Sequence, residues 1–325
     1  MVSAVPNMIG ASPEFQRVMG LIEQMARYDA PVLICGETGT GKELAARAIH
    51  YLGVRKGAPF VPLNCGALPD TLVESELFGY ERGAFTDARA ARIGLIASAE
   101  GGTLFLDEID SLPARAQVSL LRFLQDQTYR PLGGTREQSG NVRIVAAASP
   151  RLPQMIASGA FRTDLAFRLD VLSLELPPLR TRQGDARLLA QHFSRRYASR
   201  YQLPQRPFDL SSLVWLDQYA WPGNVRELDN LIHRQTLLCA RDELVLIPSL
   251  AQGAVSEELP CYNSARSVAL AAWEREYLGE LLRRTGGNVT RAAELAGKER
   301  RALGKLIKKH GIDRSGFESH VSLSN

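Results

Sequence analysis

A glycine-rich segment has the composition and position of a phosphate-binding loop. It lies between an apolar run that ends at Cys35 and a segment of helical composition, 44–50. Glycines let the backbone wrap around phosphates, amides at a helix N-terminus attract anions, and the lysine reaches the β- and γ-phosphates. The predicted nucleotide-binding residues are Gly36, Glu37, Thr38, Gly39, Thr40, Gly41, Lys42 and Glu43. The alternative is a purely structural turn, and Glu43 stands where the general motif has a Ser or Thr that holds magnesium.

A second chemical group is the acid pair Asp107 and Glu108, which ends the apolar run 103–106. Ligands bind outside the carboxyl ends of strands in open α/β sheets, so we expect this pair beside the phosphate loop. Asp107 would hold the magnesium ion, Mg2+, directly or through water, and Glu108 would orient the water that attacks ATP. Asn64, at the end of the preceding apolar run, could hydrogen-bond Glu108, although alone it reads as a turn residue. The alternative for the pair is two surface acids at a strand end.

Five short apolar runs, separated by helix-length stretches, must position these groups. They are 31–35, 60–63, 103–106, 142–148 and 171–176. Continuous rather than alternating hydrophobicity is typical of parallel strands covered on both faces, so the first half is predicted to be α/β. Helical patterns replace the β-type runs from 177 to about 246, which indicates an all-α second region. Residues 248–264 carry small residues and two prolines without periodicity, as a linker does.

The C-terminal region concentrates positive charge. Residues 281–312 contain nine Lys and Arg against two Glu, a net charge of +7 in a chain whose formal net charge is +4. A short helix, a turn at Gly297 and a basic helix from about 298 to 309 match a helix-turn-helix whose second helix enters the major groove of DNA. Arg300, Arg301 and Lys305 are the predicted DNA contacts. A helical hairpin with a solvated basic face is the alternative.

Two further features belong to this region. Gly304 is unexpected inside a helix, where glycine costs about 1 kcal/mol relative to alanine, and close approach to the DNA backbone is one explanation. Upstream, an apolar stripe is predicted to pair two subunits. Its members are Val268, Leu270, Trp273, Tyr277, Leu278, Leu281 and Leu282.

Composition narrows the class of protein. The chain has 325 residues, 45% of them hydrophobic and 23% charged, as expected for several globular domains. No apolar run reaches the ~18 residues of a membrane span, and no basic leader with an apolar segment precedes the first helix. The four cysteines are far apart and form no zinc pattern. We therefore expect a cytoplasmic protein with reduced thiols and no membrane partner.

At this point several longer motifs resemble one family, the sigma-54-dependent AAA+ activators, or bacterial enhancer-binding proteins, over nearly the whole chain. The matching segments are GETGTGKE at 36–43, ESELFGYERGAFTDA at 74–88, AEGGTLFLDE at 99–108, FRTDLAFRL at 161–169, LPPLRTR at 176–182 and WPGNVREL at 221–228. The segment TGGNVTRAAELAG at 285–297 resembles the Fis-type helix-turn-helix that ends such proteins.

The resemblance implies a fold and a domain order. The fold is an AAA+ parallel five-stranded sheet with flanking helices, followed by an all-α lid and a C-terminal helix-turn-helix. The implied domains are an ATPase subdomain 1–176, a lid 177–247, a linker 248–264, a Fis-type domain 265–312 and a tail 313–325. No sensory domain is expected ahead of the core, as in stand-alone members of the family.

The resemblance also implies site roles. Arg162 and Arg168 look like arginine fingers that reach the nucleotide of a neighbouring subunit, and Arg226 looks like the lid arginine that senses the γ-phosphate. Asn64 looks like the switch partner of Glu108. One geometric objection applies: residues six apart on one regular helix differ in direction by roughly 240°, so both arginines could not face one phosphate. A structural role for either arginine stays open.

The segment 83–88 resembles the loop that contacts sigma-54, with Phe85 and Thr86 at its tip. Two departures from the family stand out. Asp87 occupies a position that is usually glycine, which adds a charge at the contact, although aspartate tolerates turn geometry. Ala148 and Ser149 replace the more common Thr-Asn, and only the serine can still donate a side-chain hydrogen bond.

The resemblance therefore implies a transcriptional activator that binds upstream duplex DNA and uses ATP with Mg2+ to remodel the sigma-54 RNA polymerase holoenzyme. It also implies self-assembly, with a hexameric ring when active and a dimer when inactive, and control by a separate regulatory protein acting in trans. The competing interpretation is a DNA-binding regulator of the same fold that no longer engages sigma-54, which Asp87 and the Ala148-Ser149 pair suggest.

Overall fold

The chain divides into two compact units, Met1–Ile247 and Pro248–Asn325. The computed structural model of the chain describes residues 8–85, 88, 90–240, 242–246, 274, 277–279, 281–282 and 284–309. Among these residues, no helix is long and apolar enough to cross a membrane.

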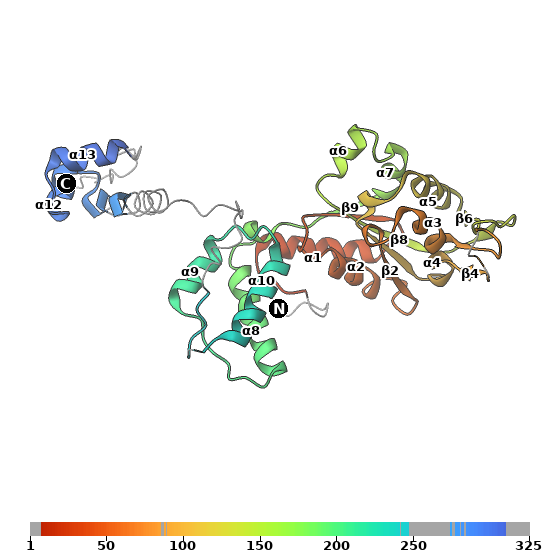
Figure 1. Ribbon diagram of the computed structural model, residues 1–325, viewed down its shortest axis with the longest axis horizontal. Helices are drawn as coiled ribbons and strands as arrows, with labels where there is room; N and C mark the ends of the chain where they lie inside the picture. Colours follow the sequence, from red (N-terminus) through yellow and green to blue (C-terminus); the bar gives the residue numbers. More distant parts are fainter. Residues whose placement is uncertain are drawn as a thin grey trace. The chain divides into compact units, whose positions relative to one another are not determined.

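A five-stranded parallel sheet forms the centre of the first unit (Figure 1), as the five apolar runs predict. In spatial order its strands are β2 (Phe60–Asn64), β5 (Thr103–Asp107), β8 (Arg143–Ala148), β1 (Val32–Cys35) and β9 (Leu172–Glu175). Neighbouring strands are in parallel register, so that Asn64 is paired with Asp107 and Cys35 with Ala148. The carboxyl ends of β2, β5, β8 and β1 therefore lie at one edge.

Two hydrophobic layers cover the sheet, because successive strand residues point to opposite faces. Leu104 and Leu106 pack in one cluster and Phe105 in the other. The Phe105 side is covered by α1 (Pro13–Ala26) and α2 (Lys42–Tyr51). The opposite side is covered by α3 (Asp70–Phe78), α4 (Leu95–Ser98), α5 (Ala114–Asp126), α6 (Leu152–Ala157) and α7 (Thr163–Leu169). Burial of both faces explains why the runs are continuously apolar.

Two small antiparallel hairpins, which the sequence analysis did not predict, extend from this core. The first pairs β3 (Gly79–Tyr80) with β4 (Arg92–Ile93), and the second pairs β6 (Thr128–Tyr129) with β7 (Gln138–Ser139). They touch each other, because Leu132 accepts a backbone hydrogen bond from Glu81 and donates one to Gly79. The loop 83–88 lies between β3 and β4.

The helical lid follows the short 3-10 helix η3 (Leu179–Thr181). It consists of α8 (Asp185–Arg200), α9 (Leu210–Gln218) and α10 (Asn224–Leu238), packed around their own cluster with Trp221 at 1% exposure. The sheet and the lid belong to one compact unit. The boundary between residues 176 and 177 accordingly stays a prediction.

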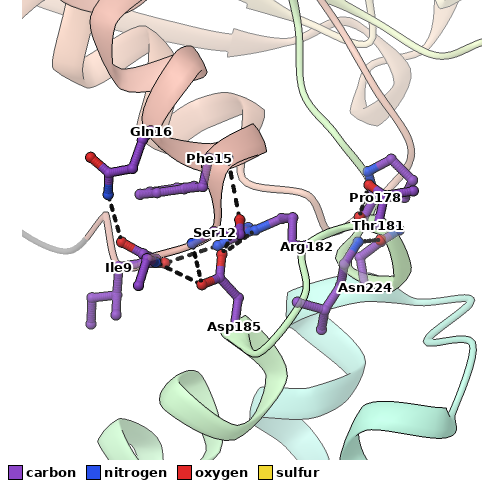
Figure 2. A network of polar contacts seen from close by, with 12 residues as sticks. Ile9, Ser12, Phe15, Gln16, Pro178, Thr181, Arg182, Asp185 and Asn224 are labelled. Atoms are coloured by element: carbon purple, nitrogen blue, oxygen red, sulfur yellow. Dashed lines mark hydrogen bonds and ion pairs between the residues drawn. The ribbon is translucent and has the colours of Figure 1, made fainter. Parts of the chain in front are cut away.

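A buried carboxylate joins the lid to the segment that precedes α1 (Figure 2). Asp185 accepts hydrogen bonds from the Ala11 and Ser12 amides at 2.6 and 3.0 Å, from Ser12 Oγ at 2.9 Å and from Arg182 Nε at 2.9 Å. Arg182 also donates to the Ile9 carbonyl and lies over the Phe15 ring. Burial lowers the pKa of Arg182, while the Asp185 charge opposes that shift.

The second unit contains α12 (Val289–Leu295) and α13 (Arg300–Lys309), and the Asn288 side chain caps α12. Its core includes Leu278, Leu281 and Leu282, which belonged to the predicted dimerisation stripe. These three leucines are packed against α12 and α13 of the same chain and form part of this core, whereas Tyr277 of the stripe is 40% exposed. That the stripe pairs two subunits stays a prediction. Val268, Leu270 and Trp273 lie outside the described residues.

The Asp185 joint generates a stability prediction. Asp185→Ala should lower the free energy of unfolding by ~3–5 kcal/mol, because it leaves the buried Arg182 charge without a partner. Denaturant unfolding followed by tryptophan fluorescence measures this, since Trp215 and Trp221 lie in the lid. As a matched control, Asp217→Ala removes the exposed Arg187–Asp217 pair and should cost at most ~1 kcal/mol. Equal effects of the two substitutions would contradict a special role for the joint.

Candidate functional site

The phosphate loop connects β1 to α2 in the predicted arrangement. Gly39 and Gly41 have φ values of 80° and 101°, a region that glycine adopts without strain. Lys42 begins α2, and its Nζ donates to the Gly36 and Glu37 carbonyls at 2.7 and 3.2 Å. Burial lowers the pKa of Lys42, whereas the charges of Asp107, Asp110 and Glu108 raise it. A cation surrounded by carboxylates at the end of a glycine loop can bind a nucleotide phosphate that is coordinated to a metal ion.

Glu43 also lies at this site, but its carboxylate is engaged on the surface of α2. It forms an exposed ion pair with Arg47 one helical turn further along α2, at 2.7 Å. A side chain held there by Arg47 does not replace the metal-binding hydroxyl of the general motif. The hydroxyl of Thr40, in the same loop, donates to the Glu37 carbonyl at 2.8 Å.

The acid pair lies at the carboxyl end of β5, next to Asn64 of β2. Glu108 has a left-handed backbone with φ 52° and ψ 47°, and its amide donates to Asp107 Oδ1 at 3.0 Å. Asn64 Oδ1 accepts the Ala67 amide at 3.0 Å, which caps the 3-10 helix η1 (Cys65–Ala67). The Glu108 carboxylate lies where a Cβ on Gly66 would be placed, with Asn64 Oδ1 3.5 Å from that position. Asn64 and Glu108 are thus neighbours, but the structure shows no hydrogen bond between them.

A third acid, which the sequence analysis missed, links β5 to β8. Asp110 accepts hydrogen bonds from Ser149 Oγ at 2.7 Å and from the Ser149 amide at 3.2 Å. The serine hydroxyl is therefore directed at a carboxylate. Ala148 is fully buried. No local sequence pattern signals this contact, because it joins two different strand ends.

A cleft of about 960 Å³ contains the loop, the acids and one face of the lid. Arg226, in α10, lines this cleft. The helix α10 contacts the phosphate loop directly, because the Val225 amide donates to the Gly39 carbonyl at 3.0 Å. Apolar residues far from the loop in sequence also line the cleft, and the sequence analysis missed them. They are Met8, Ile9, Leu189, Phe193 and Val225. Apolar walls beside a phosphate-binding end suit a flat base.

Arg162 and Arg168 are exposed and are not among the residues that line this cleft. Arg162 precedes α7 with an extended backbone, φ −69° and ψ 130°, so the objection based on a continuous regular helix does not apply. Its guanidinium pairs with Asp164 through two contacts of 3.0 and 2.7 Å, which raises the pKa of Arg162. Arg168 lines a separate cavity of about 360 Å³ together with Arg55 and Arg143.

The loop after β3 presents an aromatic side chain. Phe85 is 41% exposed, and its ring lies 4.9 Å from the Tyr80 ring. Backbone hydrogen bonds from Gly83 to the Ala88 carbonyl and from Ala88 to the Phe85 carbonyl close the loop base. Thr86 and Asp87 lie outside the described residues.

The predicted DNA face lies on α13 of the second unit. Arg300, Arg301 and Lys305 are exposed, whereas Leu303 and Ile307 on the other face are buried. A Cβ built on Gly304 would meet no described atom within 4 Å. Packing inside the unit therefore does not require this glycine, and close approach to DNA stays a prediction.

Comparison with known proteins covers all three regions. The sigma-54 interaction domain family matches residues 8–175, the AAA+ ATPase lid domain family matches 180–259, and the Fis family of bacterial regulatory proteins matches 269–310. The chain is 44% identical over 310 residues to the transcriptional regulatory protein GlrR of Escherichia coli, covering 94% of this chain and 68% of that protein.

Two more similarities bear on the cleft and the fold. The sigma54-dependent transcriptional activator SfnR of Pseudomonas putida is 44% identical over 290 residues, which are 86% of this chain and 78% of that protein. The crystal structure of NtrX from Brucella abortus in complex with ATP matches with a TM-score of 0.75 and 32% identity, over 94% of this chain and 70% of that chain.

Two substitutions in the cleft should separate binding from turnover. Lys42→Ala should weaken nucleotide binding, because it removes the phosphate-facing charge, whereas Glu108→Gln should bind nucleotide but stop hydrolysis. Equilibrium binding of a fluorescent ADP analogue and steady-state ATP turnover measure the two effects. Turnover near the wild-type rate in Glu108→Gln would refute the assignment of Glu108.

Proposed function

Since this chain belongs to the sigma-54 interaction domain family and is an AAA+ ATPase with a Fis-type helix-turn-helix, we propose that it activates transcription by remodelling the sigma-54 RNA polymerase holoenzyme. It binds upstream duplex DNA through α13 and hydrolyses ATP in the cleft of its first unit. The observation that carries the proposal is the exposed Phe85 on a hairpin built into the ATPase core. An aromatic side chain exposed at a loop tip suits insertion into a protein partner.

The chain offers a direct route from the cleft to this loop. Asn64 ends β2 beside Glu108 and caps η1, after which α3 leads into β3 and the Phe85 loop. A change at the Asn64–Glu108 neighbourhood during hydrolysis would reach Phe85 through one short, well-packed helix. This continuity supports the role of Asn64 as a switch partner of Glu108.

The remaining cleft residues divide the chemistry among them. The glycine loop and Lys42 hold the phosphates, Glu108 orients the attacking water, and Arg226 senses the γ-phosphate from the lid. Asp107 supplies a carboxylate oxygen, the donor type that magnesium prefers. The described residues contain no cluster of three carboxylate, His or Cys ligands. A magnesium ion held by Asp107 would neutralise charge on the phosphates.

Arg162 and Arg168 act on the nucleotide of a neighbouring subunit. Their position outside the cleft of their own chain supports a role in trans, because an arginine that stabilises the transition state must reach the phosphates. Such a shared site requires a ring, which we propose to be a hexamer. The inactive dimer and the separate regulatory protein are proposed from the resemblance, and the cytoplasmic location is proposed from the composition of the chain.

One observation favours a second candidate, a DNA-binding regulator that does not engage sigma-54. Ser149 Oγ donates to Asp110, so the γ-phosphate-sensing position of β8 has its only side-chain donor already occupied. Asp87 adds a charge beside the Phe85 tip, and a desolvated unpaired carboxylate would cost several kcal/mol at a protein contact. This candidate predicts DNA binding without activation.

Open-complex formation distinguishes the two functions. With hydrolysable ATP and a sigma-54 promoter carrying its binding site, the wild-type chain should yield open complexes. Thr86→Ala should abolish them while ATP turnover and DNA binding stay near the wild-type values, because only the loop contact is lost. If the wild-type chain fails to bind sigma-54 with an ATP transition-state analogue and Asp87→Gly succeeds, the activator assignment is wrong for the natural sequence.

The role of Arg301 in DNA recognition can be tested by substitution. Arg301→Ala should cost ~1–3 kcal/mol of specific binding and relax specificity at one base position if the side chain reads a base edge. Titrations with the specific duplex and with an unrelated duplex at one salt concentration give both numbers. An equal loss on both duplexes would assign Arg301 to a phosphate contact instead.

A further inference from the structure

A single carboxylate of the phosphate loop contacts both η3, the short helix before the lid, and the first residue of the lid helix α10. Glu37 is bonded to Arg180 in η3 and to Asn224, the first residue of α10. We propose that Glu37 is a positioning residue for recognition of the γ-phosphate of ATP, and that it acts by fixing the lid arginine Arg226 relative to the phosphate loop. The proposal rests on the assigned role of Arg226 in the proposed function.

The Arg180 contact is bidentate. Arg180 Nη2 lies 2.6 Å from Glu37 Oε1 and Nη1 lies 2.8 Å from Oε2. Two parallel charge-assisted hydrogen bonds fix orientation as well as distance, which a single contact between flexible side chains does not. The pair is only partly exposed, with 45% of the Arg180 and 32% of the Glu37 side chain accessible. It joins residues that are 143 positions apart in the chain.

Asn224 transmits this constraint to α10. The residue is fully buried and has a left-handed backbone with φ 51°, a conformation that asparagine adopts more readily than most residues. Its Nδ2 donates to Glu37 Oε2 and to the Thr38 carbonyl, both at 3.1 Å, while its Oδ1 accepts the Leu179 amide at 2.8 Å. These three bonds fix the first residue of α10 against the phosphate loop and η3.

Arg226 follows two residues after Asn224, in the first turn of α10. Its placement therefore depends on how that turn sits on the loop. The Val225 amide donates to the Gly39 carbonyl, and a Cβ on Gly39 would collide with the Gly223 carbonyl and contact Arg226 Cβ at 3.1 Å. Loop and helix are in direct contact at this point. Glu37 is the charged group that keeps them together from the side of η3.

The Glu37 carboxylate stays ionised at neutral pH. The hydrogen bonds from Arg180 and then Asn224 lower its pKa to about 2. A carboxylate with a lowered pKa contributes its stabilisation above its ordinary pKa and loses it only as the pH falls through the lowered value. Glu37 is therefore charged at neutral pH, and we call its contacts with Arg180 and Asn224 the Glu37 clamp.

The test compares ATP with ADP, because Arg226 distinguishes them through the γ-phosphate. In the full-length Glu108→Gln protein, where ATP persists, Glu37→Gln should lower the preference for ATP over ADP by roughly threefold to tenfold. Its affinity for ADP should fall less than its affinity for ATP, since Lys42 and the loop backbone stay in place. Arg180→Ala should reproduce the effect from the other side, and combining both substitutions should add little. Asp217→Asn, which breaks the comparably exposed Arg187–Asp217 pair inside the lid, is the matched control and should leave both affinities unchanged.

The decisive comparison is with Arg226→Ala. Once Arg226 is absent, Glu37→Gln should have no further effect on the ATP preference, because the clamp acts through that side chain. An unchanged preference in Glu37→Gln, or the same loss with and without Arg226, overturns the proposal. Thermal melting checks that each variant is folded, and Arg180→Ala decides the question if Glu37→Gln is not. If the role proposed for Glu37 is wrong, the expected results for Lys42→Ala and for sigma-54 binding do not change. If Lys42→Ala still binds nucleotide normally, the assignment of the cleft as the nucleotide site is wrong.

Discussion

The parallel sheet buries both of its faces, which leaves the carboxyl ends of its strands as the place where the chain can bring polar groups together. Lys42 begins α2 directly after the β1 loop, Asp107 ends β5, Asp110 lies in the next turn, the 3-10 helix η2 (Ile109–Ser111), and Ser149 follows the last residue of β8. Burial of the strands in two hydrophobic layers fixes their register, and the register in turn fixes which strand ends are neighbours. The geometry of the cleft is thus a consequence of packing several residues away from it.

Two polar contacts that differ in burial join the lid region to the rest of the first unit. Asp185 and Arg182 are almost completely buried, so separating them would leave an uncompensated charge in an apolar environment. Glu37 and Arg180 are partly exposed, so water can replace each partner at much lower cost. The buried joint suits a fixed attachment near α1. The exposed clamp suits a contact whose strength sets the position of α10.

Sequence reasoning predicted those parts of the site that lie in one short segment. Lys42 and Asp107 could be assigned because a glycine loop and a strand-end acid are local patterns whose place in a parallel sheet is fixed. Glu37 was expected only as a loop residue, since its partner Arg180 is 143 positions away. Asp185 was missed for the same reason: its ligands Ala11 and Ser12 come from a distant segment, and no periodicity marks them.

The helices of the second unit were predictable from the sequence, but the packing of its apolar stripe was not. The basic helix and the capped helix before it could be predicted from composition and turn residues. The apolar stripe could not be divided into core residues and interface residues, because the sequence does not show which elements pack on it. Leu278, Leu281 and Leu282 complete the small core with Leu303 and Ile307. The three clusters of the first unit include no described residue of the second unit. Because each unit buries a hydrophobic core of its own, we expect ATP hydrolysis to persist when the DNA-binding helices are removed.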